Sequence, residues 1–117
     1  MKKIKFRIWD KHTNSWFNSK DTHYLPKIDI QNGIISFKFR DNNYVPQQFI
    51  GIKDKNGKDI YEGDIIKHPD SFDDCIIRYE HTQATFMAID DENMGYCLSH
   101  DMYLEVIGNI YENFNLL

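Results

Sequence analysis

The stretch that decides the fold is IGIKDKNGKDIYEGDIIK, residues 50–67. Asn56-Gly57 near its centre is a strong signal for a tight turn, and Gly63 marks a second turn a few residues later. Isoleucines alternate with charged residues around these turns, as in short strands that bury one face. The stretch therefore predicts three short strands: one ending near Ile52, one over 59–61 and one over 64–68.

The same period of two recurs along the chain. It predicts an N-terminal hairpin over 3–18, a strand after Asn32-Gly33, and an antiparallel pair formed by CIIRYEH and ATFMAID. A last strand spans 104–110, with Gly108 as a bulge or a close-packing position. Loops are expected at 40–46 and 69–74, and Pro26 limits residues 18–30 to an edge strand or loop. No amphipathic helix of useful length is found, so many short strands predict an all-β, small single-domain β-barrel over 1–117.

Composition agrees with this fold class. The chain has 117 residues, 41% hydrophobic and 15% aromatic, which suits one globular domain rich in β structure. Cys75 and Cys97 are its two cysteines and form no C-x-x-C pair. We expect both to be free and buried, with a native disulfide as the alternative.

Charge and hydropathy limit the partners. A net charge of -4 argues against a broad nucleic-acid surface, although Lys2, Lys3, Lys5 and Arg7 form a local basic patch. There is no apolar run near the roughly 18 residues of a membrane span, and MKKIKFRIWD lacks the apolar region of a signal peptide. These features predict a cytoplasmic protein with no membrane association.

Two metal hypotheses fail on spacing. The acids Asp54, Asp59, Glu62 and Asp64 do not follow the register of a calcium loop, and lysines are interleaved with them. The histidines, at 12, 23, 68, 81 and 100, show no paired ligand spacing, although Cys75, His81, Cys97 and His100 would converge if their strands were neighbours. Two aspartates precede Cys75 and would raise its pKa, which does not suit a nucleophile. We therefore expect no metal, no cofactor and no catalytic residue.

Aromatic residues give the strongest functional hint. Trp9, Trp16, Tyr44, Tyr61, Tyr103 and Tyr111 cannot all be buried in so small a core. Exposed aromatics beside charges are typical of protein or single-stranded nucleic-acid contacts, whereas the alternative is that they wrap the edges of the core. The candidate binding surface comprises Lys5, Arg7, Trp9, Trp16, Tyr61, Glu62 and Asp64.

Three blocks together resemble the YopX family of phage and prophage proteins. They are KFRIWD at 5–10, QFIGIKDKNGKDIYEGDIIK at 48–67 and EVIGNIYENFNLL at 105–117. Ile50 stands where the family has Thr, Asp59 where it has Glu, and Phe114 where Pro is usual. The resemblance implies a mainly β domain with an SH3-like barrel element and assigns no catalytic residues.

Three functions follow from these observations. The first is a non-catalytic phage accessory protein that binds a protein partner or assembles with itself, using unpaired strand edges and surface aromatics. The second is a nucleic-acid-binding regulator that uses the N-terminal basic patch and the lysines at 53, 55, 58 and 67. The third is a hydrolase with Asp64 or Glu62 as its base, and the first is preferred.

Overall fold

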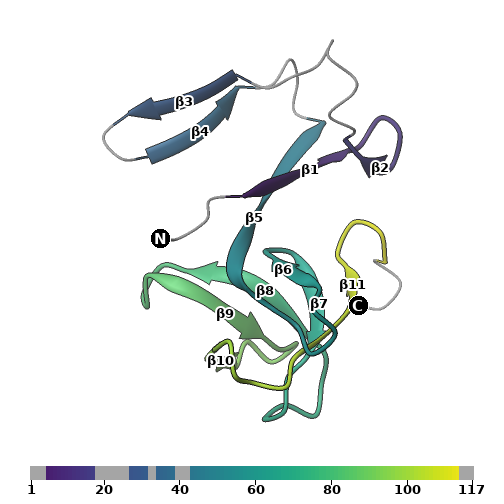
Figure 1. Ribbon diagram of the computed structural model, residues 1–117, viewed down its shortest axis with the longest axis vertical. Helices are drawn as coiled ribbons and strands as arrows, with labels where there is room; N and C mark the ends of the chain where they lie inside the picture. Colours follow the sequence, from purple (N-terminus) through teal and green to yellow (C-terminus); the bar gives the residue numbers. More distant parts are fainter. Residues whose placement is uncertain (1–4, 18–26, 32–33, 39–42, 114–117) are drawn as a thin grey trace. The chain divides into compact units, whose positions relative to one another are not determined.

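The computed structural model describes residues 5–17, 27–31, 34–38 and 43–113, drawn in colour in Figure 1. The chain divides into two compact units. The smaller is Arg7–Pro46, and the larger combines Met1–Phe6 with Gln47–Leu117. Each unit is described by itself, and the single domain expected over 1–117 stays a prediction.

The smaller unit contains two antiparallel strand pairs. β1 (Phe6–Asp10) pairs with β2 (Ser15–Trp16), which places Trp9 opposite Trp16. This confirms the N-terminal hairpin. β3 (Lys27–Gln31) pairs with β4 (Ile34–Lys38), and Gln31 lies opposite Ile34. The predicted Asn32-Gly33 turn and Pro26 lie outside the described residues.

The larger unit is built on a five-stranded antiparallel sheet with the order β10-β9-β8-β7-β11. Its strands are β7 (Asp64–Lys67), β8 (Cys75–Glu80), β9 (Thr85–Ile89), β10 (Gly95–Tyr96) and β11 (Glu105–Asn109). A further pair joins β5 (Tyr44–Lys53) to β6 (Asp59–Tyr61). The described residues contain no helix, so the predicted all-β class is confirmed.

One predicted boundary is wrong. Residues 40–46 were expected to form a loop, but β5 already begins at Tyr44 and includes Pro46. Proline suggests a loop because it has no amide hydrogen, yet a strand tolerates it where the ladder needs no donor. The same segment contains Tyr44 and Val45, which favour strands.

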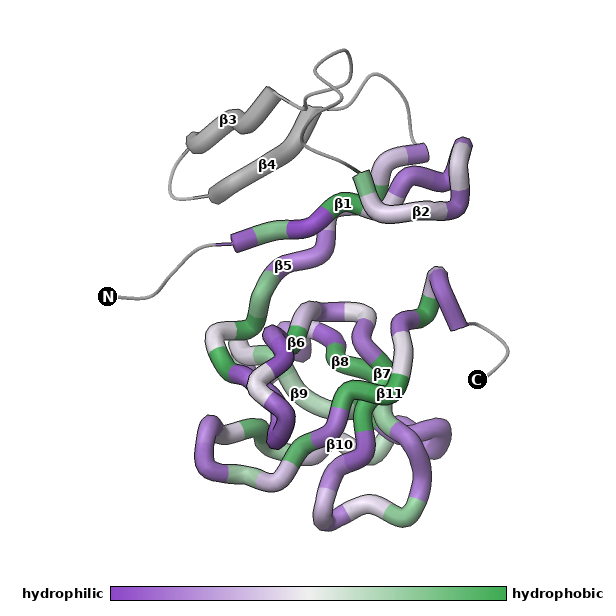
Figure 2. Tube along the Cα trace, turned by 45° about the vertical axis from the view of Figure 1, so that its right-hand side comes forward, coloured by the Kyte–Doolittle hydropathy of each residue, from purple (hydrophilic) through white to green (hydrophobic). Residues whose placement is uncertain are grey.

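The core of the larger unit lies on one face of its sheet. Its fully buried members are Ile60, Ile66, Cys75, Ile77, Ala88 and Leu104. Figure 2 shows green, hydrophobic segments gathered on β7, β8 and β11, and mostly purple connecting loops. Cys75 is buried as expected, whereas Cys97 was expected to be buried but is exposed, just after β10 ends at Tyr96. Both thiols are free.

Aspartates at strand ends organise the turns. Asp54 Oδ1 accepts hydrogen bonds from the backbone N–H groups of Asn56 and Lys58, each at 2.9 Å. The carboxylate of Asp90 does the same for Glu92 and Met94, at 2.9 and 2.8 Å. A residue in the left-handed region completes each turn, Gly57 at φ +80° and Asn93 at φ +63°. The Asn56-Gly57 turn is therefore confirmed.

Gly108 combines both roles that its sequence context predicts. The pairing of β11 with β7 shifts register between Val106 and Gly108, which is a bulge. A Cβ at Gly108 would lie 2.8 Å from Asn113 Oδ1, closer than two such atoms approach.

In the described residues, no helix has the length and apolar character needed to cross a membrane.

Gly63 and Gly57 provide a matched pair for testing this packing. Both have positive φ, so alanine at either costs about 1–2 kcal/mol of backbone strain. A Cβ at Gly63 would also overlap the side-chain amide of Gln47, whereas Gly57 has no atom within 4 Å of that position. We expect Gly63→Ala to lower the free energy of unfolding by about 1–3 kcal/mol more than Gly57→Ala, because it displaces a buried hydrogen-bonding side chain. Urea unfolding checks this, and equal losses would contradict the packing assigned to Gly63.

Candidate functional site

Asp54, the first acid of residues 50–67, ties its turn to β11. Its Oδ2 accepts a hydrogen bond from the Val106 N–H at 3.0 Å, and the Lys55 N–H donates to the Leu104 carbonyl at 2.8 Å. Burial alone would raise the pKa of Asp54, but the amides of Val106, Lys58 and Asn56 outweigh it and hold that pKa below its ordinary value. Asp54 is a structural anion.

Asp64 joins two other parts of the chain. This carboxylate is 1% exposed and accepts hydrogen bonds from the Tyr61 N–H at 2.9 Å and from Asn109 Nδ2 at 3.0 Å. Asn109 Nδ2 also donates to Gln47 Oε1 at 2.9 Å, and Asn109 Oδ1 accepts from the Tyr111 N–H at 3.0 Å. Residues 47, 64 and 109 therefore form one buried polar network.

The remaining acids of residues 50–67 are engaged separately. Asp59 pairs with Lys5, and also with Lys53 at 3.7 Å. The hydrogen bond from Lys5 is the largest cause that lowers the pKa of Asp59. Glu62 Oε1 accepts a hydrogen bond from the Gln48 N–H at 3.2 Å. These acids do not converge.

No metal centre is found in the part of the chain that the structure describes. In that part, the His, Cys, Asp and Glu side chains form no group of three or more that could hold a metal ion. His81 instead packs edge-on against the Tyr79 ring at 5.0 Å. Burial raises the pKa of the Cys75 thiol, and the carboxylates of Asp90 and Asp74 add to this effect. His23 lies outside the described residues.

The candidate binding surface is corrected at three positions. Trp9 is 5% exposed, Tyr61 7% and Asp64 1%, so they cannot form part of an exposed face. Trp9 packs edge-on against Trp16 with centroids 5.0 Å apart, and Tyr61 packs against Phe49 at 5.8 Å. These aromatic contacts follow from strand pairing, which the period of two alone does not reveal.

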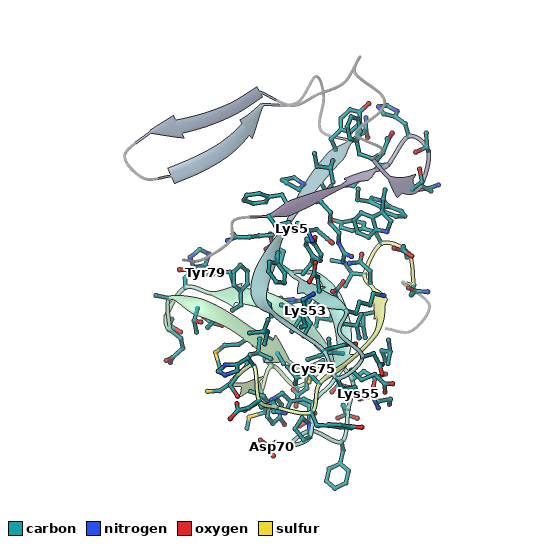
Figure 3. The ribbon with its side chains drawn as sticks, in the orientation of Figure 1. Lys5, Lys53, Lys55, Asp70, Cys75 and Tyr79 are labelled. Atoms are coloured by element: carbon teal, nitrogen blue, oxygen red, sulfur yellow. The ribbon has the colours of Figure 1, made fainter. Side chains whose placement is uncertain are left out.

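The other four residues of that surface lie partly at the surface and have contacts. Arg7 stacks over the Trp16 ring at 4.0 Å in the smaller unit. Lys5, labelled in Figure 3, belongs to the larger unit and pairs with Asp59, while Glu62 is half-buried. A binding role for Lys5, Arg7, Trp16 and Glu62 stays a prediction.

Among the residues whose burial the structure describes, the large apolar side chains that are exposed lie elsewhere in the larger unit. They are Phe72, Tyr79, Met94 and Tyr103. The sequence reasoning expected some aromatics to remain exposed, and Tyr103 is 73% exposed. It missed Phe72, although a phenylalanine between polar residues in the loop PDSFDD is a usable signal.

The sheet of the larger unit carries a second apolar row on the face opposite the core. Ile65 lies opposite Ile76, and Ile76 opposite Ile89, so three isoleucines cross three neighbouring strands. Glycines continue the row at both ends, Gly108 opposite Ile65 and Gly95 opposite Ile89. A hollow of about 440 Å³ lies over this row. We call it the isoleucine hollow, and its lining consists of Ile65, Asp73, Asp74, Ile76, Arg78, Ile89, Asp90, Asp91 and Asn93.

The rim of the isoleucine hollow is acidic. Asp73 and Asp74 precede β8, and Asp90 and Asp91 follow β9, so the antiparallel pairing brings both pairs to one end of the sheet. The Asp91 carboxylate is the largest cause of a raised pKa at Asp73, followed by burial and Asp90. Sequence reasoning missed this site, although the two Asp-Asp pairs flanking a predicted strand pair were a sufficient signal.

His68 anchors the loop that carries part of this rim. The buried imidazole accepts the Asp70 N–H at Nδ1, 3.0 Å away, so its proton lies on Nε2 and is donated to the Cys97 carbonyl at 2.9 Å. Its ring also packs on Tyr96 with centroids 5.2 Å apart. Asp70, labelled in Figure 3, lies at the far end of the unit from Lys5. The imidazole thus fixes where the 68–74 loop leaves the sheet.

The family model described as YopX protein matches residues 5–117. The chain belongs to the YopX family. It is similar to protein EF1440 from Enterococcus faecalis, with 26% identity, a TM-score of 0.62 and 97% of each chain covered. It is also similar to protein yopX from Bacillus subtilis, with 18% identity, a TM-score of 0.53, and 100% of this chain and 97% of that chain covered. This second likeness concerns the fold alone. No curated protein matches the chain.

The pH dependence of stability tests the role of Asp54 in this YopX-family fold. Its pKa is lowered in the folded state, so its contribution is fully present above the ordinary pKa of the unfolded chain and is lost as the pH falls from there through the lower folded-state pKa. We expect Asp54→Asn to destabilise the fold by about 1–3 kcal/mol at pH 7, because the amide cannot accept all three N–H groups. Its loss of stability between about pH 5 and pH 3 should be shallower than that of the wild type.

Urea titrations at several pH values measure both effects. Asp70→Asn is the control, because the Asp70 carboxylate is on an exposed residue outside the turn of Asp54. Parallel pH profiles for Asp54→Asn and the wild type would contradict the role given to this carboxylate.

Proposed function

We propose that this YopX-family chain is a non-catalytic phage or prophage accessory protein of the bacterial cytoplasm, which works by binding a protein partner or a second copy of itself. One observation carries this proposal. The acids of residues 50–67 are engaged in hydrogen bonds and ion pairs of the fold, whereas large apolar side chains remain exposed on the larger unit. Exposed apolar groups with charged neighbours are a feature of protein-binding surfaces.

The hydrolase alternative receives no support from the two acids that suggested it. A general base must reach a substrate proton within hydrogen-bond distance. Asp64 is 1% exposed and already accepts two hydrogen bonds. Glu62 accepts the Gln48 N–H. Both side chains act as structural acceptors, which favours a binding protein over an enzyme.

The nucleic-acid alternative is weakened by the partners of its lysines. Lys5 and Lys53 pair with Asp59, and Lys67 pairs with Asp74 at 3.2 Å. Lys55, in the turn after β5, pairs with Glu105 at 3.4 Å. A phosphate backbone would compete with carboxylates at each position, so a protein partner is favoured.

Self-association through the β11 edge is not favoured. The N–H of Val106 donates to Asp54 Oδ2, and the N–H of Asn109 donates to Asn113 Oδ1 at 3.2 Å. These side chains occupy donors that another strand would need. A second copy would therefore bind through exposed side chains, such as Phe72 and Tyr103, and not by extending the sheet at β11.

The double substitution Phe72→Ser with Tyr103→Ser tests the proposal, and Thr82→Ser with His100→Ser is a control at exposed polar residues. We expect the wild type and the control to recover the same protein from cells carrying the phage or prophage, or to sediment as an oligomer. The double variant should lose most of this interaction, because it loses two aromatic contact surfaces.

Affinity capture with mass spectrometry and sedimentation velocity give the two readouts. The proposal would be overturned if the wild type sediments as a monomer at high micromolar concentration and also recovers no protein that the double variant fails to recover. Recovery of nucleic acid that falls steeply with added salt would favour the regulator instead.

A further inference from the structure

We infer that the isoleucine hollow binds a basic segment of a partner protein, whose Arg or Lys side chains lie over the isoleucine row and end against the aspartate rim. The inference rests on the proposed function and names the site and the chemistry of the partner. An apolar floor with a charged rim suits amphipathic cationic side chains, which bury their aliphatic stems and keep the charged end at the edge.

The floor has the shape that such a stem requires. Ile76 and Ile89 are half-buried and face the hollow beside the fully buried Ile65. Neither glycine adds a side chain of its own to the row. Met87 and Ile89 lie over Gly95, with Met87 Cε 3.0 Å from the position of an added Cβ, and the Asn113 side chain lies over Gly108. The volume of about 440 Å³ lies within the range of about 300–1,000 Å³ typical of ligand sites. One or two extended side chains fit this space.

The negative charge of the rim favours a positively charged group in the hollow. Four aspartates and one arginine, Arg78, line the hollow. Lys67 compensates Asp74, and Asp90 is committed to its own turn and to the Tyr96 hydroxyl at 3.1 Å. Asp73 and Asp91 are left as neighbouring like charges. A bound cation relieves this repulsion, whereas a phosphate or an acidic peptide increases it.

The rim is also held in place before a partner arrives. His68 fixes the start of the 68–74 loop, and Ser71 Oγ donates to the Asp73 carbonyl at 2.9 Å. On the other side, the backbone N–H of Asn93 donates to the Asp90 carbonyl at 3.1 Å. Two braced turns thus present the carboxylates at one end of a rigid strand pair. Preorganisation of this kind lowers the entropy cost of binding.

Asp73→Asn with Asp91→Asn is the decisive variant, and Asp101→Asn with Glu112→Gln is the matched control. Both pairs remove two negative charges, but the control residues do not line the hollow. The probe is a fluorescent eight-residue peptide in which arginine alternates with valine, and a second peptide carries glutamate in place of arginine. Binding is followed by anisotropy and by NMR of the isoleucine methyl groups.

We expect the arginine peptide to shift the methyl signals of Ile65, Ile76 and Ile89, and the glutamate peptide to leave them unchanged. The rim variant should bind at least tenfold more weakly than the wild type, and the control within about twofold of it, because only the rim pair sits at the binding site. An unchanged methyl spectrum, or equal binding by both variants, would overturn the inference. Shifts at the same residues with Ca²⁺ or Mg²⁺ alone, and none with the peptide, would overturn it in favour of a cation site.

The capture experiment separates failure of this inference from failure of the proposed function. If the rim variant still recovers the partner that the wild type recovers, the binding function holds and the site lies elsewhere. If neither protein recovers a partner or self-associates, the proposed function itself fails.

Discussion

The larger unit depends on the hydrogen bond between the Asp64 carboxylate and the Asn109 side chain. A buried carboxylate is costly unless its oxygens are satisfied, and here one oxygen accepts the Tyr61 amide and the other accepts Asn109 Nδ2. Asn109 is able to donate because its second hydrogen reaches Gln47 Oε1 and its own oxygen receives the Tyr111 amide. Segments far apart in sequence are held in one register by this network, so its geometry also decides that position 63 must be glycine.

A second constraint explains why so acidic a chain shows so little acid chemistry. A carboxylate at the end of a strand accepts the N–H two residues later at Asp10, Asp54, Glu80 and Asp90. A residue with positive φ follows within each of these turns: Asn14, Gly57, Ala84 and Asn93. In each turn, the carboxylate accepts a hydrogen bond from a backbone N–H that has no partner on a neighbouring strand and that water would otherwise solvate. The acids of residues 50–67 resemble an active-site loop in composition, but Asp54 belongs to this turn architecture and the other three are engaged in ion pairs or hydrogen bonds of the fold.

Local chemistry made much of the fold predictable. The strand at Asp59–Tyr61 was predicted with its observed bounds, because Asn56-Gly57 and Gly63 fix the turns on both sides. The burial of Trp9 and Tyr61 was not predictable in this way. It depends on which strand becomes the neighbour, and the alternation of residues along one strand leaves both faces open. Which strands pair is not encoded in the local sequence pattern. The isoleucine hollow could not be predicted for the same reason, because its row forms only when β7, β8 and β9 pair in their observed register.

The two faces of the sheet assign stability and recognition to different residues. Along β8, Cys75 and Ile77 enter the core, while Ile76 and Arg78 turn to the hollow. The acids that hold the fold, Asp54 and Asp64, are buried with their oxygens satisfied, whereas Asp73 and Asp91 meet as like charges at an open rim. Two carboxylates held close together repel each other and cost free energy in the isolated chain. A bound cationic side chain would remove this cost, which is consistent with a binding role for the rim. Substitution at the rim therefore removes repulsion and leaves the core intact, which allows binding to be changed without unfolding the protein.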